Sequence, residues 1–89
     1  MIEREVEIVN RLGLHARAAA KLVHTAGGYR CRVTLMKDGE EVDAKSILGI
    51  LLMAAAQGSQ LTIRCDGQDE EEAMRAVTGL IGNRFDEES

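Results

Sequence analysis

The chain has 89 residues, a formal net charge of −4, no proline and only two aromatic residues. This length favours a single domain, residues 1–89, with one modest core, and the apolar content of 45% excludes intrinsic disorder. The acidic balance and the scarcity of aromatics argue against a nucleic-acid partner. No apolar run approaches the roughly 20 residues of a membrane span, and no basic leader precedes an apolar stretch. We therefore expect a cytoplasmic protein without membrane insertion.

The charge is unevenly distributed along the chain, and the cysteine spacing excludes two kinds of site. Residues 1–60 hold 8 Lys/Arg and 7 Asp/Glu, whereas residues 61–89 hold 3 and 8, so the acidic excess lies in the C-terminal third. Cys31 and Cys65 stand far apart without a CxxC pair, which excludes a disulfide framework and a zinc site. Both fall in phase with apolar strand positions, and we expect small core side chains, no metal and no cofactor.

In the first half of the chain, alternation over residues 3–8 predicts a strand. From Ala16 an alanine-rich segment predicts a helix that ends at the glycine pair 27–28. Alternation over residues 29–35, the Asp38-Gly39 turn and residues 40–44 predict a β-hairpin. The apolar positions of the helix repeat at i, i+3 and i+4 and should form its buried face: Ala16, Ala19, Ala20, Val23 and Ala26.

In the second half, Ser46 precedes an apolar segment and is expected to be the N-cap of a short helix. Residues 61–65 alternate as a fourth strand. Asp69 and Glu72 resemble a capping box at the start of a last helix that closes at residues 82–83, and residues 86–89 are expected to be a frayed tail. The order β-α-β-β-α-β-α predicts a two-layer α+β fold, with helices covering one face of a four-stranded sheet.

Two histidines are candidates for chemistry. His15 stands between the Gly13 loop and the predicted helix, and His24 lies nine residues further along that helix. Nine steps of about 100° point the two rings to opposite sides, so they cannot share a metal. We expect His24 to be a solvated residue of the helix surface.

The position of His15 at a helix N-terminus is compatible with two roles. The helix dipole favours a neutral, nucleophilic ring, and free backbone amides together with Arg17 suit phosphate oxygens. Alternatively, His15 only caps the helix, because no Ser, Thr, Asp or Asn stands there. No nucleophile elbow and no glycine-rich phosphate loop offers another catalytic site.

The segment after residue 45 also has two readings. Ser46 is a helix cap, a regulatory phosphorylation site, or both, since a phosphate there would favour the helix dipole and repel acidic partners. Ile47, Leu48 and Leu51 are either core residues or partly an exposed docking patch.

The motifs Gly13-Leu14-His15-Ala16-Arg17 and Lys45-Ser46-Ile47-Leu48-Gly49 resemble the HPr family, the histidine-containing phosphocarriers of the bacterial phosphoenolpyruvate:sugar phosphotransferase system. The resemblance covers nearly the whole chain. It implies an open-faced β-sandwich with sheet order 1-4-2-3. It also implies a carrier within a transfer relay rather than a stand-alone enzyme.

The resemblance assigns roles to particular residues. His15 would accept a phosphoryl group on ring Nδ1 from enzyme I and pass it to IIA domains, with Arg17 contacting the phosphate. Ser46 would be the site that HPr kinase/phosphorylase modifies. The partner-docking surface would comprise Ala16, Ala20, Lys45, Ile47, Leu48 and Leu51.

Three questions remain after this resemblance. The family commonly has proline where this chain has Ala18, and we expect the helix to begin at the same place. The chain, expected to be a monomer, could serve sugar transport or be mainly a regulatory binding module. A small metabolite-binding domain without phosphotransfer is a further alternative.

Overall fold

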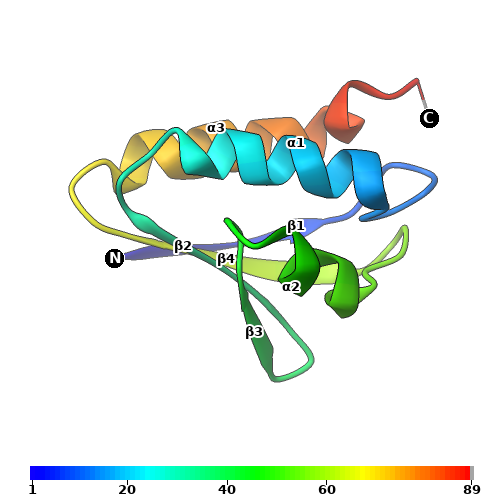
Figure 1. Cartoon of the computed structure of the whole chain (residues 1–89), viewed down its shortest axis with the longest axis horizontal. Helices are drawn as coiled ribbons and strands as arrows, with labels where there is room; N and C mark the ends of the chain where they lie inside the picture. Colours follow the sequence, from blue (N-terminus) through cyan, green and yellow to red (C-terminus); the bar gives the residue numbers. More distant parts are fainter. Residues whose placement is uncertain (89) are drawn as a thin grey trace.

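The computed structural model describes residues 1–88 and shows a sheet with helices on one face (Figure 1). The sheet has four antiparallel strands in the order β1-β4-β2-β3, which confirms the predicted order. Alternating burial along β4 matches the predicted alternation, with Leu61, Ile63 and Cys65 buried. The strands are β1 (Ile2–Glu7), β2 (Arg32–Lys37), β3 (Glu40–Asp43) and β4 (Gln60–Asp66).

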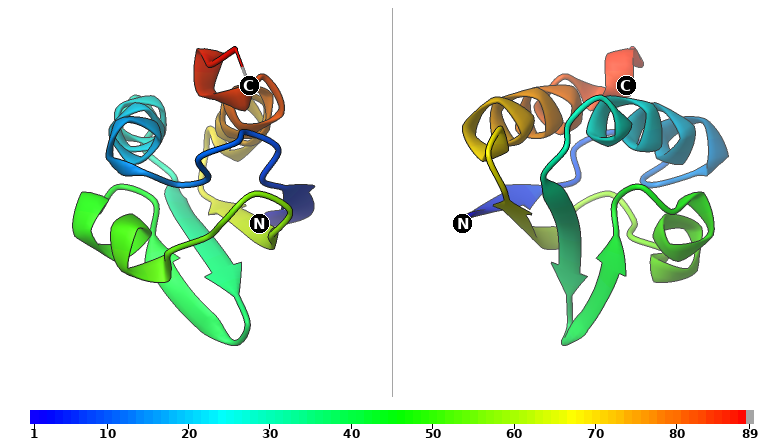
Figure 2. Two further views of the ribbon diagram at one scale, coloured as in Figure 1. Left: turned by 90° about the vertical axis from the view of Figure 1, so that its right-hand side faces the viewer. Right: turned by 60° about the vertical axis from the view of Figure 1, so that its left-hand side comes forward.

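Helices α1 (Ala16–Gly27) and α3 (Glu70–Gly82) lie side by side over the sheet, as both views of Figure 2 show. The short helix α2 (Ile47–Met53) lies against α1 and β3. A 3₁₀ turn, η1 (Arg84–Asp86), follows α3. The α+β two-layer prediction is therefore confirmed, and α1 begins at Ala16 although Ala18 stands where the family commonly has proline.

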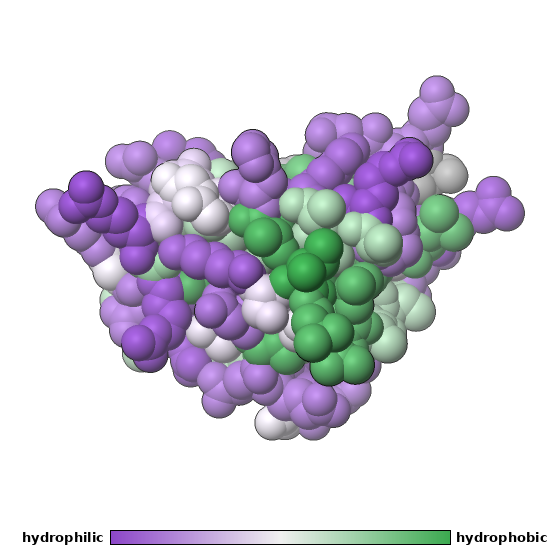
Figure 3. Space-filling model, in the orientation of Figure 1, coloured by the Kyte–Doolittle hydropathy of each residue, from purple (hydrophilic) through white to green (hydrophobic). Residues whose placement is uncertain are grey.

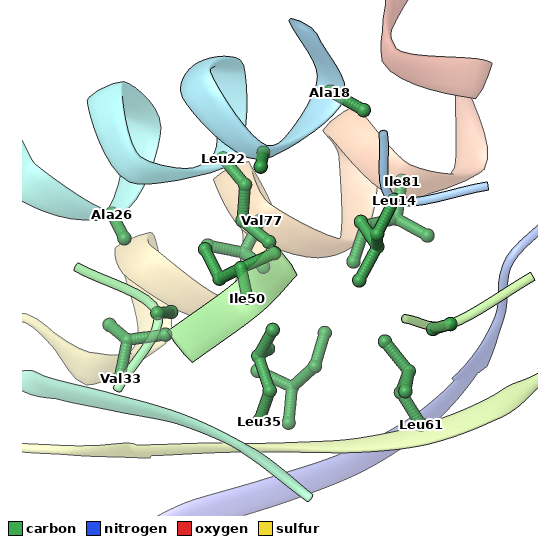
Figure 4. Packing of buried hydrophobic residues seen from close by; sticks show 14 of the residues in the cluster. Leu14, Ala18, Leu22, Ala26, Val33, Leu35, Ile50, Leu61, Val77 and Ile81 are labelled. Carbon is green, nitrogen blue, oxygen red and sulfur yellow. The ribbon is translucent and has the colours of Figure 1, made fainter. Parts of the chain in front are cut away.

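Aliphatic side chains from both layers form the core between helices and sheet (Figure 4). Leu22 of α1 and Val77 of α3 point toward Leu35 of β2 and Leu61 of β4, and all four are at most 1% exposed. Cys31 and Cys65 are buried, as expected of core residues. Burial raises the pKa of the Cys31 thiol to about 11, so this thiol stays protonated and unreactive at neutral pH.

The predicted buried face of α1 is partly wrong. Ala19 and Ala26 are buried as expected, but Ala16 and Ala20 are exposed, and Ala18 is buried instead. Alanine is small and apolar at every position of this segment, so its pattern does not distinguish the two sides of the helix. The error matters for the site, because it leaves Ala16 and Ala20 on the surface beside Arg17.

Asp69 precedes α3 but does not cap it. Its carboxylate accepts hydrogen bonds from the backbone amides of Arg30 at 2.8 Å and Cys31 at 2.9 Å. The predicted capping box is therefore wrong, since no side-chain bond to the helix amides forms. Asp69 instead ties the start of α3 to the connection between α1 and β2, and this connection is irregular until β2 begins at Arg32, later than predicted.

Asp69→Asn is expected to lower stability at pH 7 more than at low pH. The hydrogen bond from the Arg30 amide, joined by that from Cys31, lowers the pKa of Asp69 below its ordinary value of 3.8. The stabilisation is thus complete above the unfolded-state pKa and is lost as pH falls through the folded-state pKa. Urea unfolding at several pH values should show the difference between the two proteins shrinking below pH 3.8.

Asp38→Asn is the matched control for this prediction. Asp38 lies in the exposed turn between β2 and β3, and among residues 1–88 its side chain forms a hydrogen bond and an ion pair with the neighbouring Lys37 alone. Its difference from the wild-type protein should be small at every pH. A pH-independent effect of Asp69→Asn would contradict the assignment of the ionised carboxylate.

The C-terminal residues 86–88 are not the frayed tail that their polarity predicts. Phe85 in η1 is fully buried and anchors the segment against the core. The Lys21 ammonium of α1 donates a hydrogen bond to the Phe85 carbonyl at 2.6 Å. This anchor brings Glu87 back over the start of α1, and Ser89 lies outside the described residues.

Within residues 1–88, no helix is both long and apolar enough to cross a membrane. Over the same residues, no group of three or more His, Cys, Asp and Glu side chains has the arrangement of a metal site.

Candidate functional site

A tight loop before α1 sets the position of His15. Gly13 has φ +66°, the left-handed region that glycine adopts without strain, and its amide donates to the Asn10 carbonyl at 3.2 Å. The Asn10 side-chain amide donates back to the Gly13 carbonyl at 2.8 Å. Leu14 then donates to the Ala55 carbonyl at 2.9 Å, which fixes the loop against the segment after α2.

His15 is the N-cap residue of α1, in extended conformation with φ −76° and ψ 178°. Its side chain makes no capping hydrogen bond, and the first turn of α1 contains no acidic residue. Ala16 and Arg17, which begin the helix, are exposed, so their amides lie at the surface directly after His15, at the positive end of the dipole. This arrangement favours the binding of an anion next to the ring.

Glu87 contacts the His15 ring, a pairing of residues 72 positions apart. The contact joins ring Nε2 to a Glu87 carboxylate oxygen, and the other oxygen accepts from the Asn10 side chain at 3.2 Å. Burial alone would raise the pKa of Glu87, but the hydrogen bonds from His15 and Asn10 outweigh it and lower the pKa below its ordinary value. Glu87 is thus a carboxylate at neutral pH and accepts a hydrogen bond from Nε2–H.

An open hollow of about 360 Å³ surrounds this contact. Arg17 lines it from the exposed side of α1, and Glu88 lines it from the C-terminal segment. Among residues 1–88, no side chain forms a hydrogen bond or an ion pair with the Arg17 guanidinium. A cation without a fixed partner beside a histidine is suited to a transient phosphate.

Ser46 is the N-cap of α2, as predicted, and its hydroxyl accepts a hydrogen bond from the Gly49 amide at 3.2 Å. Such a cap contributes about 1 kcal/mol to stability. Ser46 is only half-buried, so the residue that caps α2 is also partly accessible at the surface.

The apolar residues of α2 form an exposed patch, shown as the hydrophobic area beside α1 in Figure 3. Ile47, Leu48 and Leu51 are 45%, 64% and 37% exposed, so the alternative that they belong to the core is wrong. Leu52 adds to the exposed apolar surface of α2. An uncovered apolar patch of this kind is typical of a protein interaction surface.

Lys45 and His24 lie apart from the hollow around His15. The Lys45 ammonium donates to the carbonyls of Tyr29 at 2.7 Å and Cys31 at 2.9 Å, beyond the C-terminal end of α1. The twelve residues of α1 span about 18 Å between that end and His15. His24 is exposed near the same far end, as expected of a solvated histidine.

Two residues of the site were not predicted from sequence. Asn10 follows the first predicted strand and Glu87 lies in the predicted C-terminal tail, and neither position carries a local signal of contact with His15. Only Phe85 offers a clue, because a bulky aromatic in an otherwise polar C-terminal segment is a typical anchor.

Comparisons with known proteins identify the family to which the chain belongs. A family model described as "PTS HPr component phosphorylation site" matches residues 2–83. The phosphocarrier protein HPr of Cupriavidus necator is 51% identical over 87 residues, covering 98% of each chain. The crystal structure of HPr from Thermoanaerobacter tengcongensis has 43% identity and a TM-score of 0.97, with all of both chains covered. A dimer of HPr from the same organism has 42% identity and a TM-score of 0.79, covering 98% of this chain and 100% of that one. The chain belongs to the HPr family of phosphocarrier proteins of the phosphotransferase system.

Proposed function

We propose that this protein accepts a phosphoryl group on His15 Nδ1 from enzyme I and donates it to IIA domains. The observation that carries the proposal is the contact between His15 Nε2 and Glu87 at the start of α1. Because a carboxylate only accepts hydrogen bonds, Nε2 holds the ring hydrogen and Nδ1 of the neutral ring keeps its lone pair. His15 directly precedes the first turn of α1, whose amides can bind phosphoryl oxygens.

Arg17 has the role of binding the transferred phosphate. Its guanidinium lines the hollow beside His15 and is free to make charge-assisted hydrogen bonds to phosphoryl oxygens. The open hollow also suits a carrier, which must present the same phosphoryl group to a donor and then to an acceptor protein.

The proposed docking surface comprises exposed residues of α1 and α2. Ala16 and Ala20 leave space for close approach, while Ile47, Leu48 and Leu51 offer apolar area that desolvates on contact. Lys45 stays a predicted member of this surface. Its ammonium is held by carbonyls of Tyr29 and Cys31, so its part in docking would require the methylene stem or a change of rotamer.

Ser46 is proposed as a regulatory site for HPr kinase/phosphorylase. A phosphate there would stand at the start of α2, directly before the apolar residues of the docking surface. The added charge would suit the helix dipole and would repel an acidic partner, which would lower acceptance of the phosphoryl group from enzyme I.

Labelling with two donors tests the proposal. Enzyme I and phosphoenolpyruvate should add one acid-labile phosphoryl group, about 80 Da by mass, and His15→Ala should abolish it while Ser46→Ala keeps it. HPr kinase with ATP should label the wild-type protein and His15→Ala but not Ser46→Ala. Equal labelling of His15→Ala and wild-type protein by enzyme I would refute the carrier role.

A mainly regulatory HPr-like module without sugar transport is the second candidate. The exposed patch on α2 and the accessible Ser46 hydroxyl favour it, since both serve binding without phosphotransfer. It predicts labelling of Ser46 by the kinase and no transfer from His15 to any IIA domain. We also propose a monomer, which sedimentation of the purified protein would test against the dimer known for a relative.

A further inference from the structure

We infer that Glu87 is a positioning residue that holds the hydrogen on His15 Nε2 before and after phosphoryl transfer, so that the phosphorylated ring stays in its readily transferring, cationic form. The inference rests on the proposed function and deepens it. It concerns the C-terminal segment, residues 84–88, whose polarity alone predicts no role at all.

Glu87 is held in place by the anchored C-terminal segment and by Asn10. Phe85 is buried in the core, and its carbonyl accepts a hydrogen bond from Lys21 at 2.6 Å. The buried Asn10 side chain donates to Glu87 at 3.2 Å while it also donates to the Gly13 carbonyl at 2.8 Å. Asn10 thus joins Glu87 to the same loop that positions His15.

Before transfer, the carboxylate accepts a hydrogen bond from Nε2–H, which leaves the lone pair of the neutral ring on Nδ1. Nδ1 attacks the phosphorus of the phosphoryl group on the donor protein. The new N–P bond forms as the bond between phosphorus and the donor atom breaks, and the electron pair of that bond returns to the donor atom.

After transfer, Nε2 has kept its hydrogen, so the phosphorylated imidazole carries a positive charge that the Glu87 carboxylate balances. A cationic phosphoimidazole releases its phosphoryl group more readily, because the leaving group is then neutral imidazole and not its anion. Glu87 therefore favours onward transfer without touching the phosphoryl group.

Other charged side chains lie near the same ring, and their influence must be distinguished from that of the Glu87 carboxylate. Arg17 and Glu88 line the hollow around His15 and Glu87, and Lys21 of α1 interacts electrostatically with Glu87. Glu88 has the same charge as Glu87 and lines the same hollow, but it makes no hydrogen bond to the ring among the described contacts. Glu88→Gln is consequently the matched control for Glu87→Gln.

The first test measures phosphoryl loss from purified phosphorylated proteins as a function of pH. Wild-type protein and Glu88→Gln should lose the group at similar rates at neutral pH. Glu87→Gln keeps a neutral acceptor but loses the charge, so its rate should be roughly tenfold lower, with the profile displaced by about one pH unit toward acid. Equal profiles for both variants would overturn the inference.

The second test needs no phosphorylation and so separates this inference from the proposed function. Nitrogen-15 NMR of the unphosphorylated protein should show the His15 Nε2 hydrogen exchanging with water roughly tenfold faster in Glu87→Gln than in Glu88→Gln. The same exchange rate in both would overturn the role of Glu87. Failure of His15 to accept any label, with exchange behaving as expected, would instead overturn the proposed function alone.

Discussion

Replacing Phe85 with alanine is expected to lower the free energy of unfolding by about 3–5 kcal/mol, with a fall in Tm of about 15–30 °C. Phe85 is 0% exposed, is one of only two aromatic residues of the chain, and is the largest of its fully buried side chains. Its removal leaves a cavity at the end of the core. Urea and thermal unfolding, followed by circular dichroism, measure the loss.

Leu52→Ala is the control for this substitution. Leu52 is also a large apolar residue, but it is 74% exposed on α2 and contributes little burial. Its effect should stay within about 0.5 kcal/mol. A small effect of Phe85→Ala, comparable with that of Leu52→Ala, would show that the C-terminal segment is not anchored in solution.

Phe85→Ala should also affect the site, because this anchor holds Glu87 over His15. Below its lowered Tm, the folded variant should resemble Glu87→Gln in the exchange of the His15 Nε2 hydrogen. Normal exchange in a folded Phe85→Ala protein would mean that Asn10 alone positions Glu87.

Individual strands, the hairpin turn and the cap of α2 were predictable because their signals are local, whereas the order of the strands in the sheet came only from the family resemblance. Alternation in β4, the Asp38-Gly39 turn and the Ser46 cap each depend on residues close in sequence, and the structure confirms all three. The buried side of α1 was not predictable, since a run of alanines has no apolar contrast between its faces. Only packing against α3 and the sheet decides that Ala18 is buried and Ala20 is not.

Within the site, the residues close to a local sequence signal were predictable and the residue distant in sequence was not. His15 and Arg17 are adjacent to a helix start that glycine and alanine spacing reveals. Glu87 reaches His15 only because Phe85 is buried and residues 84–86 adopt positive φ, and a polar sequence carries no local signal of that turn. Asp69 shows the converse, because its capping motif is present but its carboxylate is used by Arg30 and Cys31 instead.

Gly13→Ala is expected to cost about 2–5 kcal/mol of stability and to slow phosphorylation of His15. A non-glycine residue at φ +66° is strained by about 1–2 kcal/mol. The new Cβ would also lie 2.5 Å from the Ala55 carbonyl oxygen and 2.9 Å from the Ala56 Cα. Since both contacts are backbone, the loop must move, at a further cost of roughly 1–3 kcal/mol.

This movement would break the geometry that supports the site. The Ala55 carbonyl accepts the Leu14 amide, and the Gly13 carbonyl accepts the Asn10 side chain, so both bonds lie in the displaced region. Loss of the Asn10 contact would free Glu87 and change the orientation of the His15 ring. The free energy of unfolding measured in urea and the initial rate of labelling by enzyme I should therefore both decrease.

Gly79→Ala is the control for Gly13→Ala: the same replacement is expected to raise stability at position 79. Gly79 is exposed within α3, and a Cβ there would meet nothing within 4 Å. Alanine in a helix interior is more favourable than glycine by roughly 0.5–1 kcal/mol, so this variant should be more stable and should label normally. If Gly13→Ala behaved like Gly79→Ala, the contact between the residue 10–14 loop and Ala55 would not be what positions His15.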